Sequence, residues 1–416
     1  MTRQYYFQRE KGYAEANLRK GKEKIMKTGL DILLENHIKE LDGKTVGVCC
    51  NHTAIDQKGD HLLDLLKERG VGVKRIFGPE HGIDATAQDM ISVEEAGYET
   101  AIETVSLYED TEESLHPKPE TLEDLDILLF DIQDIGSRYY TYQASLGYIM
   151  EVTQHTGTEV WVLDRPNPIN GDQLAGNIVQ KGYESFVSAY PLPNRHAMTM
   201  GELGLYFKHH LKIDSPYKVL KMEGWDRSVW YEDTKLPWVY PSPNMPCVET
   251  AIIYPGMCLI EGTNISEGRG TTKPFHLFGA PWINRSRLIH LLRLAAKDSG
   301  LKGCFFRAAT FEPRFQKHAG EVCHGAEIII TNRDELDPFL LGIVCLEALI
   351  KENPEKFEWR TETYEFVDDP IAIDLLFGCS AARGALETHV NSRDIQESLE
   401  ADLDDFKKIR KEYLLY

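Results

Sequence analysis

The chain has 416 residues, of which 42% are hydrophobic and 27% charged, a composition typical of a globular protein of two or three domains. Its net charge of −20 argues against a large nucleic-acid interface, because nucleic-acid phosphates would be repelled. No apolar run reaches the roughly 18 residues that a membrane helix needs. We therefore expect neither a nucleic-acid partner nor a membrane span.

Residues 1–27 are basic and polar and lack the apolar core of a secretory signal. We interpret them as an N-terminal extension, with Met26 as an alternative start. The eight cysteines contain no C-x-x-C pair, and their spacing fits no zinc template. Most stand in apolar contexts, so we expect reduced core cysteines, a cytoplasmic location, and no metal or cofactor.

Short apolar runs alternate with amphipathic helices in the first half of the chain. Buried strands are expected at 45–50, 73–77, 127–130 and 160–163, and helices at 60–69 and 143–155. Strand–helix–strand alternation predicts an α/β fold, a Rossmann-like doubly wound sheet of mostly parallel strands.

The pattern changes near residue 240, where several prolines crowd an extended connector. Beyond it we expect strands at 302–308 and 326–331 and helices at 285–298, 337–351 and 394–414. These elements predict a smaller α+β domain. The expected organisation is an extension (1–27), a Rossmann-like catalytic domain (28–245) and a C-terminal auxiliary domain (246–416).

Polar residues follow every predicted strand of the first domain. In an open parallel sheet the carboxyl ends of the strands share one edge, where ligands bind. We therefore expect these residues to converge at that edge: Asn51, His52, Glu80, His81, Asp131, Gln133, Asp134, Arg138, Asp164 and Arg165.

Glu80 is the best single candidate for acid–base chemistry. Pro79 stiffens the chain before it, and His81 could tune or share its proton. The alternative is a capping or salt-bridged glutamate. Asp131 and Asp134 could hold a divalent cation, although hydrogen bonds to sugar hydroxyls explain them equally well.

Two further stretches carry candidate residues. His196 lies just before Thr199 and Glu202, whose spacing is that of a helix capping box. The glycine-rich segment 261–275 has no apolar period, so we expect a loop that holds a polar ligand rather than only a surface turn. Its candidates are Glu261, Asn264, Ser266, Glu267 and Arg269.

Several common motifs are absent from the sequence. It contains no G-x-S-x-G elbow and no phosphate-binding G-x-x-x-x-G-K-[ST], and no G-x-G-x-x-G follows the first strand. Dinucleotide and ATP binding are therefore disfavoured. A polar site rich in carboxylates, amides and aromatic rings suits a carbohydrate instead.

Five motifs in order, at 78–82, 131–138, 164–168, 241–246 and 261–274, make the chain resemble the NamZ/YbbC family from about residue 28 to 416. The resemblance implies an exo-acting β-N-acetylmuramidase that removes N-acetylmuramic acid from the non-reducing end of peptidoglycan fragments or muropeptides. It implies a cleft between a Rossmann-like catalytic domain and a C-terminal auxiliary domain. Several relatives are exported, which leaves a periplasmic or secreted location as the alternative to the cytoplasm.

The resemblance also implies roles for site residues. Glu80 is expected as a catalytic carboxylate, with a second glutamate from 261–267. Both Glu261 and Glu267 are candidates, and Glu267 is favoured because Arg269 and glycines surround it. Asn244, in the fourth motif, is expected to bind substrate. Arg138, Arg165 or Arg269 is expected to pair with the lactyl carboxylate of muramic acid. Replacing that arginine should lower the activity on muramyl substrates more than the activity on glucosaminyl ones.

Two other functions remain open from the residues alone. The first is a metal-dependent sugar deacetylase or amidase that uses Asp131, Asp134 and histidines. The second is a non-catalytic muropeptide-binding protein that keeps the same cleft.

Overall fold

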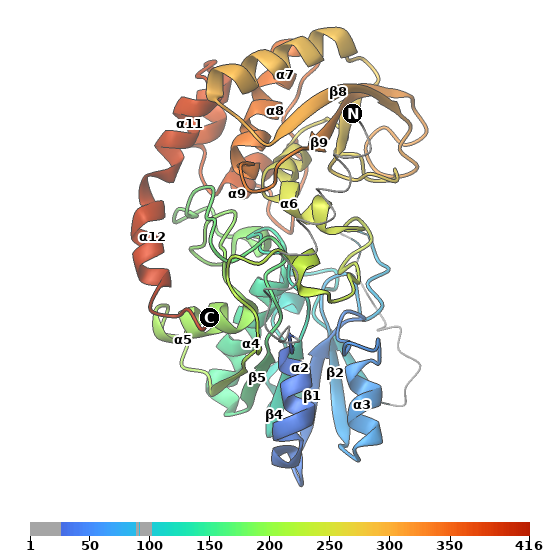
Figure 1. Cartoon of the computed structure of the whole chain (residues 1–416), viewed down its shortest axis with the longest axis vertical. Coiled ribbons are helices and arrows are strands. Elements are labelled where there is room, and N and C mark those ends of the chain that lie inside the picture. The colour runs from blue at the N-terminus through green and yellow to red at the C-terminus, as the bar shows by residue number, and fades with distance from the viewer. Residues whose placement is uncertain (1–25, 89–90, 92–101) are drawn as a thin grey trace, which may run out of the picture.

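The computed structural model of the protein describes residues 26–88, 91 and 102–416 (Figure 1). Residues 1–25, nearly all of the expected N-terminal extension, lie outside the described residues. The described chain forms a parallel-sheet part and a second part built around a smaller sheet. No helix among these residues is both long and apolar enough to cross a bilayer.

The first part is a six-stranded sheet in the order β3-β2-β1-β4-β5-β6, in which every neighbouring pair is parallel. This strand order is that of a doubly wound Rossmann-like fold, so the predicted fold class is confirmed. The strands are β1 (Val46–Cys50), β2 (Val73–Gly78), β3 (Glu103–Ser106), β4 (Ile127–Asp131), β5 (Glu159–Leu163) and β6 (Tyr217–Leu220).

Helices cover both faces of this sheet because its central strands are apolar on both sides. Side chains alternate between faces along a strand. Val46 and Val48 face the core under α2 (Gly29–Ile32) and α3 (Leu62–Glu68). Leu128 and Phe130 face the core under α4 (Tyr142–Thr156) and α5 (Met200–His209).

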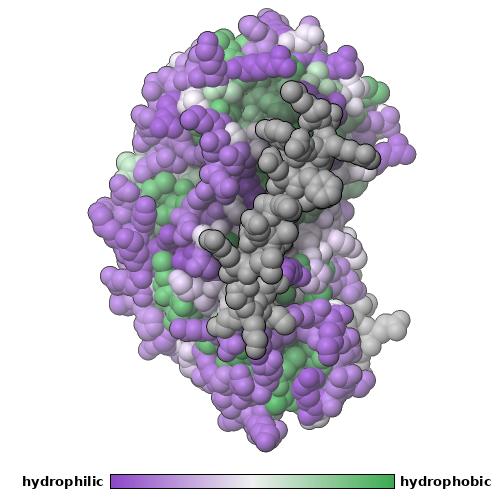
Figure 2. Space-filling model, viewed as in Figure 1, coloured by the Kyte–Doolittle hydropathy of each residue, from purple (hydrophilic) through white to green (hydrophobic). Residues whose placement is uncertain are grey.

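The second part has an antiparallel sheet in the order β7-β9-β8, which confirms the predicted smaller α+β domain. Its strands are β7 (Leu277–Ala280), β8 (Cys304–Phe311) and β9 (Cys323–Ile330). Its helices are α6 (Val248–Met257), α7 (Arg285–Ser299), α8 (Pro338–Glu352), α9 (Ala372–Phe377), α10 (Ala381–Glu387), α11 (Ser392–Leu399) and α12 (Leu403–Arg410). The face in Figure 2 is largely hydrophilic, with hydrophobic residues in small separate patches.

The prediction of one continuous helix at 394–414 is wrong. A short 3-10 turn, Glu400–Asp402, separates α11 from α12. Glu400 turns towards the first part, where its carboxylate accepts a hydrogen bond from the backbone N–H of Gly176 at 3.4 Å. The break therefore lets the chain bend back onto the parallel-sheet part.

Residues 403–416, which we call the clasp, lie against the parallel-sheet part (Figure 1). The Arg410 guanidinium donates to the carbonyl oxygens of Gly171 at 3.0 Å and Ala197 at 2.8 Å. The hydroxyl of the last residue, Tyr416, donates to the buried carboxylate of Asp164 at 2.7 Å. The end of the second part is thus anchored inside the first.

The packing of α6 on α8 depends on two glycines. A Cβ atom on Gly342 would lie 2.3 Å from the carbonyl oxygen of Gly256, which is backbone and cannot rotate away. Gly342→Ala is therefore expected to lower the free energy of unfolding by about 1–3 kcal/mol. Gly384, exposed in α10 with no neighbour within 4 Å, is the matched control.

Gly384→Ala should raise stability by up to about 1 kcal/mol, because alanine favours a helix. Urea unfolding of both variants measures the difference. Equal stability of the two variants would show that the α6–α8 contact does not require glycine.

Candidate active site

A narrow cavity lies between the carboxyl edge of the parallel sheet and the second part of the chain. Three carboxylates from distant positions, Glu80, Glu261 and Glu365, line it. The remaining polar and aromatic lining is His81, Tyr139, Tyr140, Thr141, Tyr142, Ser242, Asn244, Tyr254, Arg269, Phe275 and Tyr364. Both parts of the chain and the connector between them therefore contribute to its wall.

Glu80 reaches the cavity because it follows the end of β2 in a tight turn. The backbone N–H of Gly82 donates to the carbonyl oxygen of Pro79 at 2.9 Å. The Glu80 side chain is 5% exposed and accepts a hydrogen bond from the Thr141 hydroxyl, just before α4. His81 has a left-handed backbone, and its Nδ1 lies 2.9 Å from the carbonyl oxygen of Ala87.

Glu261 lies in the 3-10 turn Cys258–Gly262 that follows α6. One carboxylate oxygen lies 2.8 Å from an Arg269 guanidinium nitrogen, and the other accepts a hydrogen bond from the Tyr364 hydroxyl at 2.9 Å. Arg269 and Tyr364 thus hold the Glu261 carboxylate in place in the cavity wall.

Glu267 is buried in a different set of ion pairs. Its oxygens lie 3.2 Å from Arg269 and 3.1 Å from the Lys317 ammonium, which also donates to three backbone carbonyl oxygens of the loop. Burial raises the pKa of Glu267, but the charges of Lys317 and Arg269 outweigh it and bring the pKa down to about 2. These contacts anchor the loop to Lys317.

Replacing Glu267 is expected to damage stability. Glu267→Gln leaves the Lys317 charge without its carboxylate partner, which should cost about 3–5 kcal/mol. Because the pKa of Glu267 is lower in the folded than in the unfolded protein, its contribution is present above about pH 4.5 and is lost as the pH falls towards 2.

Urea unfolding of the wild type and of Glu267→Gln at pH 7 and at pH 3.5 tests both statements. The stability difference between the two proteins should be largest at pH 7 and shrink at pH 3.5. A difference that stays constant with pH would contradict the ion-pair assignment.

A second, open cavity of about 600 Å³ adjoins the first and shares Glu261 and Arg269 with it. Asn264, Glu267, Trp359 and Arg360 are among its lining residues. Asn264 also braces the loop, because its amide donates to the carbonyl oxygen of Lys356 at 2.8 Å. Ser266 accepts the backbone N–H of Gly268 at 3.2 Å.

The acidic residues after β4 and β5 do not line the Glu80 cavity. Asp131 forms a buried ion pair with Arg165, at 3.0 Å to its Nη2. Asp134 accepts the backbone N–H of Gly136 at 2.6 Å and lies 3.5 Å from His196. The Asp131–Arg165 pair is thus satisfied within the fold, whereas Oδ1 of Asp134 and Nε2 of His196 are buried without a hydrogen-bond partner among the described residues.

The other predicted site residues are also placed in structural contacts. Arg138 is fully buried and donates to the carbonyl oxygens of Asn177, Leu192 and Leu376. Three more residues brace neighbouring turns. Asn51 forms hydrogen bonds with Thr53 and Tyr142, and a ring nitrogen of His52 lies 2.7 Å from the carbonyl oxygen of Tyr240. The Gln133 amide donates to the carbonyl oxygens of Asp134 and Pro166.

Several lining residues of the two cavities carried no sequence signal, and four of them make or accept the contacts described here. Thr141, Tyr364 and Glu365 line the Glu80 cavity, and Lys317 lines the second one. Glu365 accepts a hydrogen bond from Tyr108 at 3.0 Å and has a left-handed backbone, φ 46°. Nothing in the sequence around 364–365 marks it, because the contact partner is more than 250 positions away.

The chain is similar to known proteins over most of its length. Two adjoining family models match the chain, one described as "Exo-beta-N-acetylmuramidase NamZ, N-terminal" over residues 46–249 and the other as its C-terminal counterpart over residues 252–416. The chain belongs to the NamZ family.

Similar NamZ-type proteins include the peptidoglycan β-N-acetylmuramidase NamZ of Bacillus subtilis (strain 168). It is 40% identical over 396 residues, which cover 94% of this chain and 91% of the relative. Crystal structures of two DUF1343 family proteins from Bacteroides fragilis are similar to the present one. The first has a TM-score of 0.81 at 30% identity, and the second 0.72 at 27%; both comparisons cover 94% of this chain and 99% of the other.

Proposed function

We propose that the protein is an exo-acting β-N-acetylmuramidase that hydrolyses non-reducing-end N-acetylmuramic acid from peptidoglycan fragments. The observation that carries the proposal is the pair of carboxylates that line one cavity: Glu80 from the turn after β2 and Glu261 from the 3-10 turn after α6. Glycoside hydrolysis needs one carboxylic acid and one carboxylate on either side of the scissile bond. Membership of the NamZ family supports the same reaction.

The surroundings of the two glutamates favour different roles. Glu80 is buried beside tyrosine rings, and this apolar setting suits a proton donor to the leaving oxygen. Glu261 lies against the Arg269 guanidinium, whose positive charge suits an anionic role. We therefore assign Glu80 as the general acid and Glu261 as the anion that stabilises or attacks the developing cation.

Arg269 is our candidate for recognition of the lactyl group. Of the three arginines named from the sequence, it alone lines the cavity that contains Glu80. Arg138 and Arg165 do not line that cavity, and a lactyl carboxylate at Arg269 would share the guanidinium with Glu261 and Glu267. The open cavity, with Trp359 as an apolar ring against which a sugar can stack, provides room for more of the glycan.

The test is release of para-nitrophenol from its β-N-acetylmuramide, compared with the β-N-acetylglucosaminide, and release of N-acetylmuramic acid from an N-acetylmuramyl disaccharide. We expect turnover of both muramyl substrates and at least tenfold weaker action on the glucosaminide. Activity that EDTA abolishes and a metal restores would replace this proposal by a metal-dependent hydrolase. Muropeptide binding without turnover would make the protein a binding protein.

We further propose that the enzyme acts on glycan fragments in the cytoplasm. All eight cysteines are free thiols and most are buried, as is usual in proteins of reducing compartments. Cell fractionation with an antibody against the full chain tests the location. Recovery in the periplasm or the medium would contradict it.

A further inference from the structure

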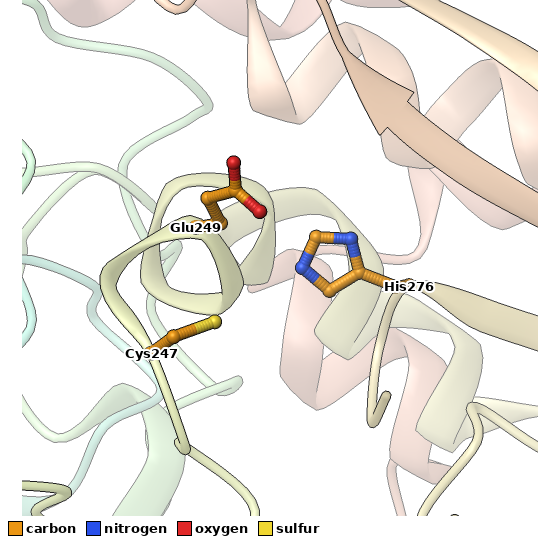
Figure 3. Close-up of side chains that lie close together, drawn as sticks. All are labelled: Cys247, Glu249 and His276. Atoms are coloured by element: carbon orange, nitrogen blue, oxygen red, sulfur yellow. The ribbon is translucent and has the colours of Figure 1, made fainter. Parts of the chain in front are cut away.

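Three side chains of different chemistry converge at the start of α6. A ligand atom from each of Cys247, Glu249 and His276 lies within 4.8 Å of the other two (Figure 3). Cys247 is the N-terminal capping residue of α6, Glu249 lies in its first turn, and His276 immediately precedes β7. We propose that these three residues form a binding site for Zn²⁺.

The donor set selects the metal. Thiolate, imidazole and carboxylate together suit Zn²⁺, whereas Ca²⁺ and Mg²⁺ prefer oxygen ligands alone. Tetrahedral Zn²⁺ places neighbouring ligand atoms about 3.5 Å apart, given bond lengths of about 2.0–2.3 Å. Cys247 and Glu249 are exposed, so small side-chain rotations can bring their atoms to that separation. Three protein ligands leave the fourth position open to water.

His276 is already oriented for this role. It is 6% exposed, and its Nδ1 lies 3.3 Å from the carbonyl oxygen of Ile328 in β9. That contact favours a proton on Nδ1 and leaves the lone pair of Nε2 for a metal. Figure 3 shows the far ring nitrogen turned towards Cys247 and Glu249. A backbone carbonyl behind a histidine ligand is the usual outer-shell arrangement of zinc sites.

The position of the cluster indicates what bound Zn²⁺ would do. Asn244, three residues before Cys247, and Phe275, directly before His276, both line the Glu80 cavity. Zn²⁺ would therefore join the end of the connector to the end of the loop that carries Glu267 and Arg269. The ligands themselves are not among the residues that line either cavity next to Glu261, so we assign the metal a structural role.

Zinc binding can be measured on the full chain after treatment with EDTA and its removal. Titration against a chromogenic zinc chelator should give one Zn²⁺ per chain. Co²⁺ substitution should produce a thiolate-to-metal charge-transfer band, which reports directly on Cys247. Saturating Zn²⁺ should also raise the melting temperature, because the metal binds the folded chain.

Two variants and one matched control make the test specific. Cys247→Ser and Glu249→Gln alter exposed side chains and should leave the fold intact. Each should weaken Zn²⁺ binding by at least the roughly 10–100-fold that loss of an outer-shell partner costs, and Cys247→Ser should abolish the Co²⁺ band. Cys304→Ser changes a partly buried cysteine of β8 and should bind Zn²⁺ like the wild type.

Three outcomes would overturn the proposal. The first is the absence of a zinc complex that competes with the chelator. The second is equal Zn²⁺ affinity of Cys247→Ser and Cys304→Ser. The third is alkylation of Cys247 at the same rate with and without saturating Zn²⁺, which would leave only an accessible thiol. None of these readouts depends on glycosidase activity.

Discussion

Glu80→Gln is expected to lower kcat/KM for an N-acetylmuramyl disaccharide by about 10²–10⁴-fold, while the protein stays folded. Glutamine keeps the shape of the side chain and can still accept the Thr141 hydrogen bond, but it cannot deliver a proton to the leaving sugar oxygen. The para-nitrophenolate anion is a much weaker base than a sugar alkoxide, so it can leave without being protonated. The loss should therefore be distinctly smaller with the aryl glycoside.

Glu365→Gln is the matched control for this experiment. Glu365 is another buried carboxylate of the same cavity, hydrogen-bonded to Tyr108 at 3.0 Å. Any loss of activity it causes should be the same for both leaving groups. If Glu80→Gln also lowered kcat/KM by the same factor for the disaccharide and for the aryl glycoside, Glu80 would not be the general acid.

The second large effect is expected at Glu261. In the proposed mechanism Glu261→Gln removes the negative charge that would face the reacting sugar, so turnover of both substrates should fall by at least about 10³-fold, whatever the leaving group. Arg269 keeps a carboxylate partner in Glu267, so the variant should remain folded.

Glu267→Gln provides the comparison with Glu261→Gln. Its remaining activity, corrected for the folded fraction measured by circular dichroism, should stay within about tenfold of the wild type, because Glu267 faces Lys317 and is absent from the lining of the Glu80 cavity. The reverse result, with an active Glu261→Gln and an inactive folded Glu267→Gln, would exchange the two assignments.

The choice between these glutamates depends on contacts that the sequence does not reveal. Both lie in one glycine-rich loop, and the sequence favoured Glu267 because Arg269 and glycines surround it. The structure adds two partners from distant segments. Tyr364 donates to the Glu261 carboxylate, and Lys317 forms an ion pair with Glu267. A single sequence carries no information about either pairing.

The fold was more predictable than the site. The central strands β1, β4 and β5 are mostly apolar, and β2 is buried over its second half; all four were expected from these apolar residues. The edge strands β3 and β6 are mostly half-exposed and were missed. Most of the polar residues expected at the sheet edge bind other parts of the fold, such as Arg138 with three backbone carbonyl oxygens, and some bind one another. Asp131 with Arg165 is the clearest case, because their mutual pairing keeps both from a ligand.

The clasp formed by residues 403–416 has a consequence for how the molecule loses its structure. Tyr416 donates to Asp164, which also accepts from the Thr199 hydroxyl and the Gly201 backbone in the first turn of α5. Melting of the second part would pull Tyr416 away and leave that buried carboxylate short of one donor. We therefore expect the stability of the parallel-sheet part to depend on the second part, so that removal of the clasp should lower it.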